Sequence, residues 1–501
     1  MIEKAKHIHL SGICGTAMAS LAGLLQAKGC RVTGSDAAAY PPMSDQLREM
    51  GIEVAQPYAE GNLGSTPDGV QPGTLPDLVV IGNALSRGNP EVERALDDRI
   101  PFTSMAAVVH DEFLKGRESL VVAGTHGKTT TTSMLAWIFQ TAAEADAAFE
   151  PSFLVGGVAE NFGSSYQLRP TRRFLIEGDE YDTAFFDKGP KFLHYFPDGL
   201  ILTSVEFDHA DIYEDLEHVK TAFKRLVNLV PRRGRIVAYD GSENVSECVS
   251  KAFCPVERYG FGETADWQIA ELRHEVGHEG GKSLWKVLRG GDLWAEFAMP
   301  LAGEHNVLNA TAAAALAAWQ GVPVESIAAA LDSFRSVKRR LEVKAVVNGV
   351  TIIDDFAHHP TAIRETLKAL RQAYPFSNQS ANEGPRLWAV LEPRSNTLRR
   401  NVFERELVES LELADRVILA AVYQQARIPE GERLHPEQVV TALNAAGTPA
   451  LLGVDVAAIV EEIAREARAG DVVAILSNGG FNGIYEKLPT ALKSNGIGNK
   501  E

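Results

Sequence analysis

A chain of 501 residues is too long for one hydrophobic core, and its length predicts roughly two to four domains. Its formal net charge of -17 disfavours nucleic acid and anionic membranes as partners, because proteins that bind them normally present a basic face. No apolar stretch is long enough to cross a bilayer, and the four cysteines lack C-x-x-C spacing, so we expect a cytoplasmic protein in a reducing compartment.

Short apolar runs alternate with helical patterns along most of the chain, which indicates βαβ units and an α/β fold. Continuous Val, Ile and Leu runs are typical of parallel strands that are covered on both faces. The predicted strands are His7–Leu10, Arg31–Gly34, Leu78–Gly82, Leu120–Gly124, Phe174–Glu177, Leu200–Ser204, Arg235–Tyr239, Lys344–Val347, Val350–Asp354, Leu387–Leu391, Arg416–Ala421 and Asp471–Leu476. The segment Gly262–Met299, with short strands and glycine turns, predicts an antiparallel addition.

Two breaks in this pattern predict three domains. The first lies near Asp111–Glu118, a charged segment just before a new strand. The second lies near Ser336–Arg340, after an alanine-rich helical region and before a new series of strands. The predicted domains are residues 1–114, 115–336 and 337–501.

The first glycine-rich loop follows the N-terminal strand. A dinucleotide fingerprint would require glycine where the chain has Cys14 and Ala17, so the loop is a poor NAD site and argues against an oxidoreductase. A helix N-terminus after Gly12 and Gly15 still favours a nucleotide diphosphate. Asp36 stands about where an acid that binds ribose would follow the second strand.

A second glycine loop, Gly124-Thr-His-Gly-Lys-Thr129, joins a strand to a helix. Its glycines allow backbone N–H groups to converge on phosphate oxygens, and the helix N-terminus adds partial positive charge. Lys128 supplies a full charge, and the hydroxyl of Thr129 suits Mg²⁺. We therefore predict an ATP phosphate site, although a solvated glycine turn is the simpler alternative for such a pattern.

Acidic clusters follow two later strands. Because ligands bind at the carboxyl ends of parallel strands, these clusters are expected at the same rim as the phosphate loop. Glu177 is the leading Mg²⁺ ligand, and His209 is a candidate for a second metal ion. Asp179, Glu180 and Asp182 are interpreted as solvated loop charges.

Three further patterns are weaker. Asn306 opens an alanine-rich helix and could read adenine, although asparagine near a helix start is commonly a cap. Arg340 and the acids after Ile353 could contact a nucleotide, but such residues are more often ordinary hinge charges. Arg394 could clamp a carboxylate, or it could belong to a capped turn.

The order of motifs resembles the Mur ligase family from about Lys6 to Lys487. The motifs that carry this resemblance are GICGTAM, AGTHGKTTTT, IEGDEYD, EFDHADIY, GEHNVLNA, VKRRLE and DDFAHHPTA. The resemblance implies a Rossmann-like UDP-binding domain, a central P-loop ATPase domain and a Rossmann-like C-terminal domain. Cys14 and Ala17 depart from the glycines that are usual in the first motif.

The resemblance also implies roles for individual residues. Catalytic roles fall to Lys128, His209 and Arg340, and Mg²⁺ binding falls to Thr129, Glu177 and His209. Nucleotide contacts are Gly124, Thr125, His126, Gly127, Lys128, Thr129, Thr130, Asn306 and Asp355, with His359 in the same motif as Asp355. Substrate-binding candidates are Gly12, Gly15, Asp36, Arg394, Ser395 and Asn396. Carbamylation of Lys224, which some family members have at a comparable lysine, is not assigned.

Two branches of the family compete as the best match. EPRSNT and SNGGFNGIYEKL resemble the branch that uses ATP to attach L-Ala-γ-D-Glu-meso-diaminopimelate to UDP-N-acetylmuramate through an acyl phosphate during peptidoglycan recycling. GTHGKTTTT and DDFAHHP also resemble the branch that attaches L-alanine, which is the alternative. A nucleotide-gated binding protein without ligase activity is a third hypothesis.

Overall fold

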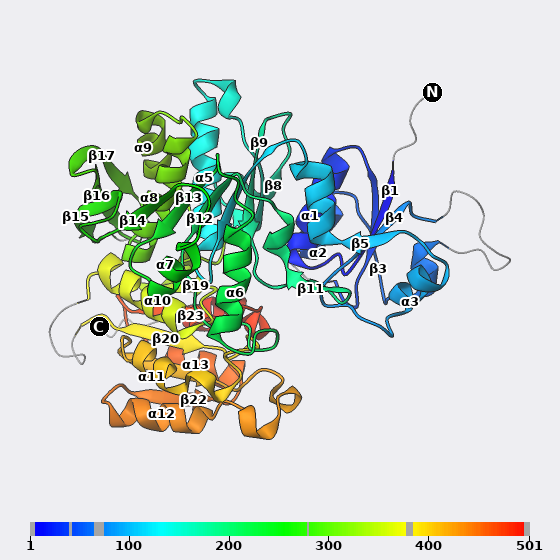
Figure 1. Cartoon of the computed structure of the whole chain (residues 1–501). Coiled ribbons are helices and arrows are strands. Elements are labelled where there is room, and N and C mark those ends of the chain that lie inside the picture. Colours follow the sequence, from blue (N-terminus) through cyan, green and yellow to red (C-terminus); the bar gives the residue numbers. More distant parts are fainter. Residues whose placement is uncertain (1–5, 40–42, 65–74, 278–279, 377–383, 495–501) are drawn as a thin grey trace. The chain divides into compact units, whose positions relative to one another are not determined.

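The structure, a computed structural model, describes residues 6–39, 43–64, 75–277, 280–376 and 384–494 (Figure 1). The chain forms two compact units. The first unit comprises Met1–Glu206, Leu216–Gln268 and Asn309–Ala330, and the second comprises Phe207–Asp215, Ile269–Leu308 and Leu331–Glu501.

The first unit begins with a parallel sheet in the order β3-β2-β1-β4-β5. Its elements are β1 (His7–Ser11), α1 (Thr16–Ala27), β2 (Arg31–Ser35), α2 (Met43–Glu49), β3 (Val54–Ala55), β4 (Leu78–Ile81), α3 (Pro90–Asp97), β5 (Phe102–Ser104) and α4 (Met105–Val109). The strand order reverses beside β1, because β2 and β4 pair with its two edges. Such a reversal opens a crevice at the carboxyl ends of the strands, where Gly12 follows β1.

The first unit also contains the sheet that carries the phosphate loop, in the order β14-β13-β12-β6-β9-β7-β8. These strands are parallel apart from β8, which pairs antiparallel with β7. The elements are β6 (Glu118–Ala123), α5 (Lys128–Ala143), β7 (Ser152–Ala159), β8 (Ser164–Gln167), β9 (Arg173–Gly178), β12 (Gly199–Leu202), α6 (Leu216–Val227), β13 (Arg235–Tyr239), α7 (Glu243–Val249) and β14 (Val256–Gly260). A small hairpin of β10 (Asp182–Ala184) and β11 (Asp187–Pro190) follows β9.

Burial explains why β6 lies in the middle of this sheet. Leu120, Val121, Val122 and Ala123 are all fully buried between β9 and β12. The buried residues of α5 include Met134, Leu135, Ile138 and Phe139. The strand and helix that flank the phosphate loop are therefore firmly packed.

Antiparallel strands occur in the segment where the sequence predicts them. β16 (Lys282–Arg289) pairs antiparallel with β17 (Asp292–Met299), which confirms that prediction. The preceding strand β15 (Trp267–Glu275) begins in the first unit, where its first two residues pair in parallel with the end of β14. Residues 278 and 279 of this segment lie outside the described residues.

The second unit contains a sheet in the order β18-β19-β23-β20-β21-β22, parallel apart from the β18–β19 pair. Apolar clusters lie on both faces of this sheet. Its elements are β18 (Glu342–Val347), β19 (Val350–Asp355), α10 (Pro360–Ala373), β20 (Leu387–Leu391), α11 (Glu404–Leu411), β21 (Arg416–Ala420), α12 (Pro436–Ala445), β22 (Ala450–Gly453), α13 (Val456–Glu466), β23 (Val472–Leu476) and α14 (Ile484–Ser494). Helices α8 (Glu304–Trp319) and α9 (Val324–Asp332) precede it in the chain.

Every strand predicted from an apolar run is present, with both ends within two residues of the expected bounds. The sequence did not predict β3, β5, β7, β8, β10, β11, β14 or β22, which are short, glycine-containing or rich in polar residues. In the part of the chain that the structure covers, no helix has both the length and the apolar character needed to cross a bilayer.

Candidate functional site

The loop between β6 and α5 depends on two glycines in conformations that other residues rarely adopt. Gly124 has a φ of 137° and Gly127 has a φ of 80°. A Cβ atom at Gly124 would lie 2.1 Å from Oγ1 of Thr203, and a Cβ atom at Gly127 would lie 2.6 Å from Oδ1 of Asn309. Both the backbone and its surroundings therefore require glycine at these positions.

Residues after β12 hold this loop from the side. The amides of Thr125 and His126 donate to the carbonyl and to the hydroxyl of Ser204, at 3.0 and 2.9 Å. The hydroxyl of Thr203 donates to the carbonyl of His126 at 2.5 Å. The amides at the start of α5 have no intrahelical acceptor, as at any helix N-terminus, so the loop fits a phosphate group.

Lys128 is the first residue of α5 and lies above this loop. Its Nζ donates to the carbonyls of Gly124 and Thr125 at 2.7 and 3.1 Å, and it lies 2.7 Å from Oε2 of Glu180. Burial opposes the ammonium charge, but Glu180 and then Asp179 outweigh burial and raise the pKa of Lys128. The lysine is therefore charged, as binding to phosphate requires.

The predicted Mg²⁺ ligands Thr129 and Glu177 lie side by side. The hydroxyl of Thr129 donates to Oε1 of Glu177 at 2.9 Å, and the amide of Gly156 donates to Oε2 at 2.7 Å. Burial raises the pKa of Glu177, although nearby Lys128 opposes this shift. Two hard oxygens next to the phosphate loop form a donor set that fits Mg²⁺, which keeps water as its other ligands.

The acids after β9 differ from the sequence-based interpretation. Glu180 and Asp182 are 2% and 6% exposed, so the prediction of solvated loop charges is wrong for both. Each buried carboxylate has a lysine partner that offsets the cost of burying its charge. Glu180 pairs with Lys128, and Asp182 pairs with Lys188 at 2.6 Å. Asp179 is more exposed and pairs with Lys191 at 2.7 Å.

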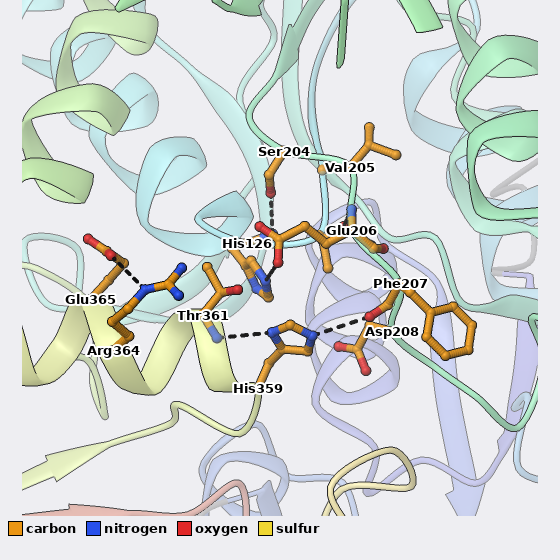
Figure 2. Close-up of polar contacts among 12 residues, drawn as sticks. His126, Ser204, Val205, Glu206, Phe207, Asp208, His359, Thr361, Arg364 and Glu365 are labelled. Atoms are coloured by element: carbon orange, nitrogen blue, oxygen red, sulfur yellow. Dashed lines mark hydrogen bonds and ion pairs between the residues drawn. The ribbon is translucent and has the colours of Figure 1, made fainter. Parts of the chain in front are cut away.

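Two more residues near the loop interact with each other in the first unit. Nε2 of His126 lies 3.4 Å from Oε2 of Glu206 (Figure 2). The amide of Glu206 donates to Oγ1 of Thr125 at 2.8 Å. Thr130 lies in the first turn of α5 and is buried. The chain after β12 thus contacts the phosphate loop through both its backbone and its side chains.

In the second unit, motifs that are far apart in the sequence meet around Asp208. Its carboxylate accepts hydrogen bonds from the amide of His209 and from the hydroxyl of Thr397, both at 2.7 Å. Burial opposes its charge, but His209, His358 and His359 outweigh burial and lower the pKa of Asp208. The backbone of His209 has a φ of 55°, which turns the chain sharply at this residue.

His359 helps to join these motifs. Its Nε2 lies 3.2 Å from the carbonyl of Phe207, and its Nδ1 accepts from the amide of Thr361 at 3.3 Å (Figure 2). Nearby, the hydroxyl of Ser395 donates to the carbonyl of His358 at 3.3 Å, and Asn396 donates to Asp211 at 2.8 Å. The EFDHAD, DDFAHHP and EPRSNT motifs therefore form one cluster.

Arg394 lies against an aromatic ring at the end of β20. Its guanidinium carbon is 3.8 Å from the centre of the Tyr423 ring, and its Nη1 lies 3.5 Å from Oε1 of Glu392. A Cβ atom at Gly479 would lie 2.2 Å from Nε of Arg394, so glycine allows this close approach. The arginine is held in place by stacking, which leaves edge N–H groups as donors.

Arg340, from the second predicted domain break, and Asp355, from the end of β19, also lie in the second unit. Oδ2 of Asp355 accepts from the amide of Leu341, and Oδ1 accepts from the amide of Ala357, both at 2.8 Å. The guanidinium of Arg340 lies over the Phe356 ring at 5.2 Å. Asp355 therefore shapes the backbone around Arg340, in addition to any contact with a nucleotide.

Asn306 and Lys224 have partners of their own. Asn306 lies in the first turn of α8, is buried, and donates to the carbonyl of Ala302 at 2.7 Å. Nζ of Lys224 lies 2.5 Å from Oε1 of Glu247, and both side chains are substantially exposed. This arrangement offers no reason to assign carbamylation to Lys224.

The first glycine loop has most of its amides occupied. The carbonyl of Ser35 accepts from the amides of Gly12 and Ile13 at 2.8 and 3.0 Å. The carboxylate of Asp36 accepts from the amide of Cys14 at 2.9 Å. Gly15 precedes α1 with an extended backbone, and the first N–H groups of α1 have no intrahelical acceptor, as at any helix N-terminus. Asp36 acts here on the loop itself.

The structure brings the predicted residues together in separate groups. Lys128, Thr129 and Glu177 form one group in the first unit, and His209, His359, Ser395 and Asn396 form another in the second. Sequence reasoning missed Glu180, Ser204, Asp208 and Thr397. The family motifs contain Glu180 and Asp208, but their local sequence does not distinguish a buried acid from a solvated one.

Family patterns match three successive segments of the chain. The Mur ligase family catalytic domain matches residues 7–114, the Mur ligase middle domain matches residues 122–317, and the Mur ligase glutamate ligase domain matches residues 339–479.

Individual relatives span nearly the whole chain. The chain is 43% identical to the UDP-N-acetylmuramate–L-alanyl-γ-D-glutamyl-meso-2,6-diaminoheptandioate ligase of Escherichia coli K12, covering 96% of the chain and 97% of that protein. It is 29% identical to the UDP-N-acetylmuramate–L-alanine ligase of Acetivibrio thermocellus, covering 95% and 94%. The solved murein peptide ligase of Psychrobacter arcticus 273-4 is 36% identical, with a TM-score of 0.69 over 98% of the chain and 99% of that structure.

Proposed function

The chain belongs to the Mur ligase family, and we propose that it uses ATP to join UDP-N-acetylmuramate to the murein tripeptide L-Ala-γ-D-Glu-meso-diaminopimelate. The observation that carries ATP use is the phosphate loop, in which a charged Lys128 lies beside the Thr129–Glu177 oxygen pair. The tripeptide, as opposed to L-alanine, is supported by the difference between 43% and 29% identity over almost the same span.

The bond to be made links the lactyl carboxylate of the sugar to the free amine of the peptide. A carboxylate is a poor acyl donor at neutral pH, so it must first be activated. In the proposed first step the carboxylate attacks the γ-phosphorus of ATP, which yields an acyl phosphate and ADP. In the second step the amine attacks the acyl carbon, and phosphate leaves.

The residues of the first unit provide the charge that the first step requires. Lys128 and the amides at the start of α5 hold the phosphates, and their positions are set before the ligand arrives. Glu180 competes with phosphate for Lys128, so nucleotide binding must draw the lysine away from this carboxylate. Arg340, from the hinge segment, is proposed to offset further negative charge.

We further propose that Mg²⁺ is the metal. Thr129 and Glu177 would hold one ion, and His209 would hold a second. A bound Mg²⁺ neutralises charge on the phosphate oxygens and on the transition state. The chain contributes hard oxygen donors on two adjacent secondary-structure elements, α5 and β9, which keeps their spacing fixed.

Further roles follow from the same motifs. Gly12, Gly15 and Asp36 would bind or shape the site for the UDP group, while Arg394, Ser395 and Asn396 would face the peptide. The substrates and ATP are cytoplasmic metabolites, so the reaction is proposed for the bacterial cytoplasm, where it would return recycled peptide to wall synthesis.

The decisive test measures ADP release with UDP-N-acetylmuramate and either the tripeptide or L-alanine. The proposal expects rapid release with the tripeptide and little with L-alanine, and none when the UDP-sugar is omitted. Preference for L-alanine would assign the chain to the biosynthetic reaction instead. ATP hydrolysis that is indifferent to the UDP-sugar would overturn ligase activity altogether.

A further inference from the structure

A carboxylate lies fully buried under the rim of the N-terminal sheet. Glu91 is the second residue of α3 and is 0% exposed. Its Oε2 accepts from the hydroxyls of Ser11 and Ser35 at 2.5 and 2.6 Å, and its Oε1 accepts from the amide group of Asn62 at 2.7 Å. Nε2 of His9 lies 3.5 Å from Oε2. Glu91, on α3, thus links two strands and the 3₁₀ helix Glu60–Leu63.

The environment of Glu91 favours the charged form. Burial opposes the charge, but the hydrogen bonds from His9, Ser11, Ser35 and Asn62 lower its pKa to about 2. The start of α3 adds the positive end of a helix dipole. An ionised carboxylate accepts at both oxygens, whereas an amide in its place would present donors to one side.

The two serines stand immediately before the predicted nucleotide-sugar site. Ser11 ends β1 and precedes Gly12, while Ser35 ends β2 and precedes Asp36. The carbonyl of Ser35 accepts from the amides of Gly12 and Ile13, and that of Ser11 accepts from the amide of Gly82. Glu91 therefore binds the side chains of Ser11 and Ser35, whose backbone determines the shape of the Gly12 loop.

We propose that Glu91 is a positioning residue for the nucleotide sugar. It acts through Ser11 and Ser35, which fix the loop Gly12–Gly15 and the start of α1 in the geometry that binds the UDP group. The inference rests on the proposed function, because it requires the UDP-sugar to bind at this loop. It concerns affinity for one substrate and leaves the chemistry at the phosphate loop untouched.

The chain offers a matched control in the same helix. Glu93 forms an ion pair with Arg87 at 2.9 Å and accepts a hydrogen bond from the amide of Gly88, but its side chain is 30% exposed. Glu93→Gln removes a charge two residues away without touching the serines. It is expected to bind UDP-N-acetylmuramate like the wild type.

The experiment measures UDP-N-acetylmuramate binding by calorimetry, and KM for each substrate, in the wild type and in the Glu91→Gln and Glu93→Gln variants. Glu91→Gln is expected to raise the Kd and the KM for the UDP-sugar about 10- to 100-fold, as for a displaced positioning group. KM for ATP and for the tripeptide should not change. A merely structural role would lower the thermal midpoint and the amount of active enzyme without this selective change.

Unchanged UDP-sugar binding in a folded Glu91→Gln variant would overturn the inference. If that variant does not fold, Ser35→Ala is the second test, because it removes one of the hydrogen bonds to Glu91 together with the contact between Ser35 and His9. It must show a smaller rise in the KM for the UDP-sugar alone, and no rise would also overturn the inference. A wild-type chain that uses ATP but does not bind UDP-N-acetylmuramate would overturn the proposed function itself, which separates the two failures.

Discussion

Two segments in the first unit share a strand–loop–helix arrangement but differ in backbone conformation and in charge. After β1, Gly15 precedes α1 with an extended backbone, and the first turn of α1 carries no charged residue. After β6, Gly127 precedes α5 in the left-handed region, and Lys128 opens the helix. In both loops the middle amides are held by an adjacent strand end, by Ser35 and Asp36 in one and by Ser204 in the other.

The difference lies in the charge that each helix start presents. The β6–α5 segment adds an ammonium group and a hydroxyl to the helix dipole, and β9 brings the carboxylate of Glu177 to that hydroxyl, a combination that suits a triphosphate with its metal. The β1–α1 segment has only the dipole and its N–H groups, and its buried acid, Glu91, supports the loop from beneath. A glycine loop therefore reports a phosphate site only together with the charges that the fold brings to it.

The largest effect should come from removing the charge that distinguishes the second loop. Lys128→Ala should lower kcat/KM for ligation by about 10³-fold or more, because one preorganised charge at the transferred phosphoryl group is lost. ADP release under saturating tripeptide and UDP-sugar would measure it. Near-normal turnover would remove Lys128 from the reaction and erase the contrast between the loops.

The acid beneath the first loop should make this sheet sensitive to pH. Glu91 has its pKa lowered from 4.5 to about 2, so its contribution to stability is full above about pH 4.5 and disappears as pH falls toward 2. Between about pH 6 and pH 3, the free energy of unfolding of the wild type should fall by about 2 kcal/mol more than that of Glu91→Gln. Hydrogen exchange of the β1 and β2 amides would report this sheet alone; an identical pH response in both proteins would contradict it.

Because the two glycines that precede α5 and α1 differ in backbone conformation, substitution by alanine should affect stability at one and not at the other. Gly127→Ala introduces a side chain at a φ of 80° and 2.6 Å from Asn309, so we expect a loss of about 1–3 kcal/mol in stability. At Gly15 a Cβ atom would be 3.6 Å from its nearest neighbour, and Gly15→Ala should leave stability unchanged. Denaturant unfolding compares them, and equal losses would show that the loops are constrained alike.

The smallest effect is expected at Lys224. This side chain and its partner Glu247 are 39% and 44% exposed, and water screens such a pair. Lys224→Ala should keep ligation within about twofold of the wild type, since surface substitutions rarely matter. It also serves as the lysine control for Lys128→Ala. A large loss of ligation that an added short-chain carboxylic acid restores would instead indicate a carbamylated lysine.

Local pattern was sufficient for much of the fold. Buried parallel strands leave continuous apolar runs, so β13 and β20 appear with the predicted bounds. β14 was missed because Glu257 and Arg258 interrupt its run, and Glu257 pairs with Arg235 at 2.5 Å on the neighbouring strand. A strand that is stabilised by cross-strand pairs carries no periodic signal of its own.

The candidate site likewise combines features that local sequence predicts with contacts that only the fold creates. Gly124, Gly127, Lys128 and Thr129 lie within six consecutive residues, so a phosphate loop could be predicted from their spacing alone. The pairing of Asp208 with Thr397 joins residues 189 positions apart, and nothing in either motif specifies it. The hydrogen bond from the amide of Cys14 to the carboxylate of Asp36 was likewise not predicted, because a candidate ligand-binding acid gives no signal of its contacts within the fold.

The sequence by itself determined the α/β class, the phosphate loop and the Mur ligase motifs, because each depends on residues adjacent in the chain. Only the tertiary structure decided which acids are buried and what they hold. Glu180 lies 52 positions from Lys128, and Glu91 lies 80 positions from Ser11. A buried carboxylate is stable only where distant donors converge on it, and that convergence is a property of the fold.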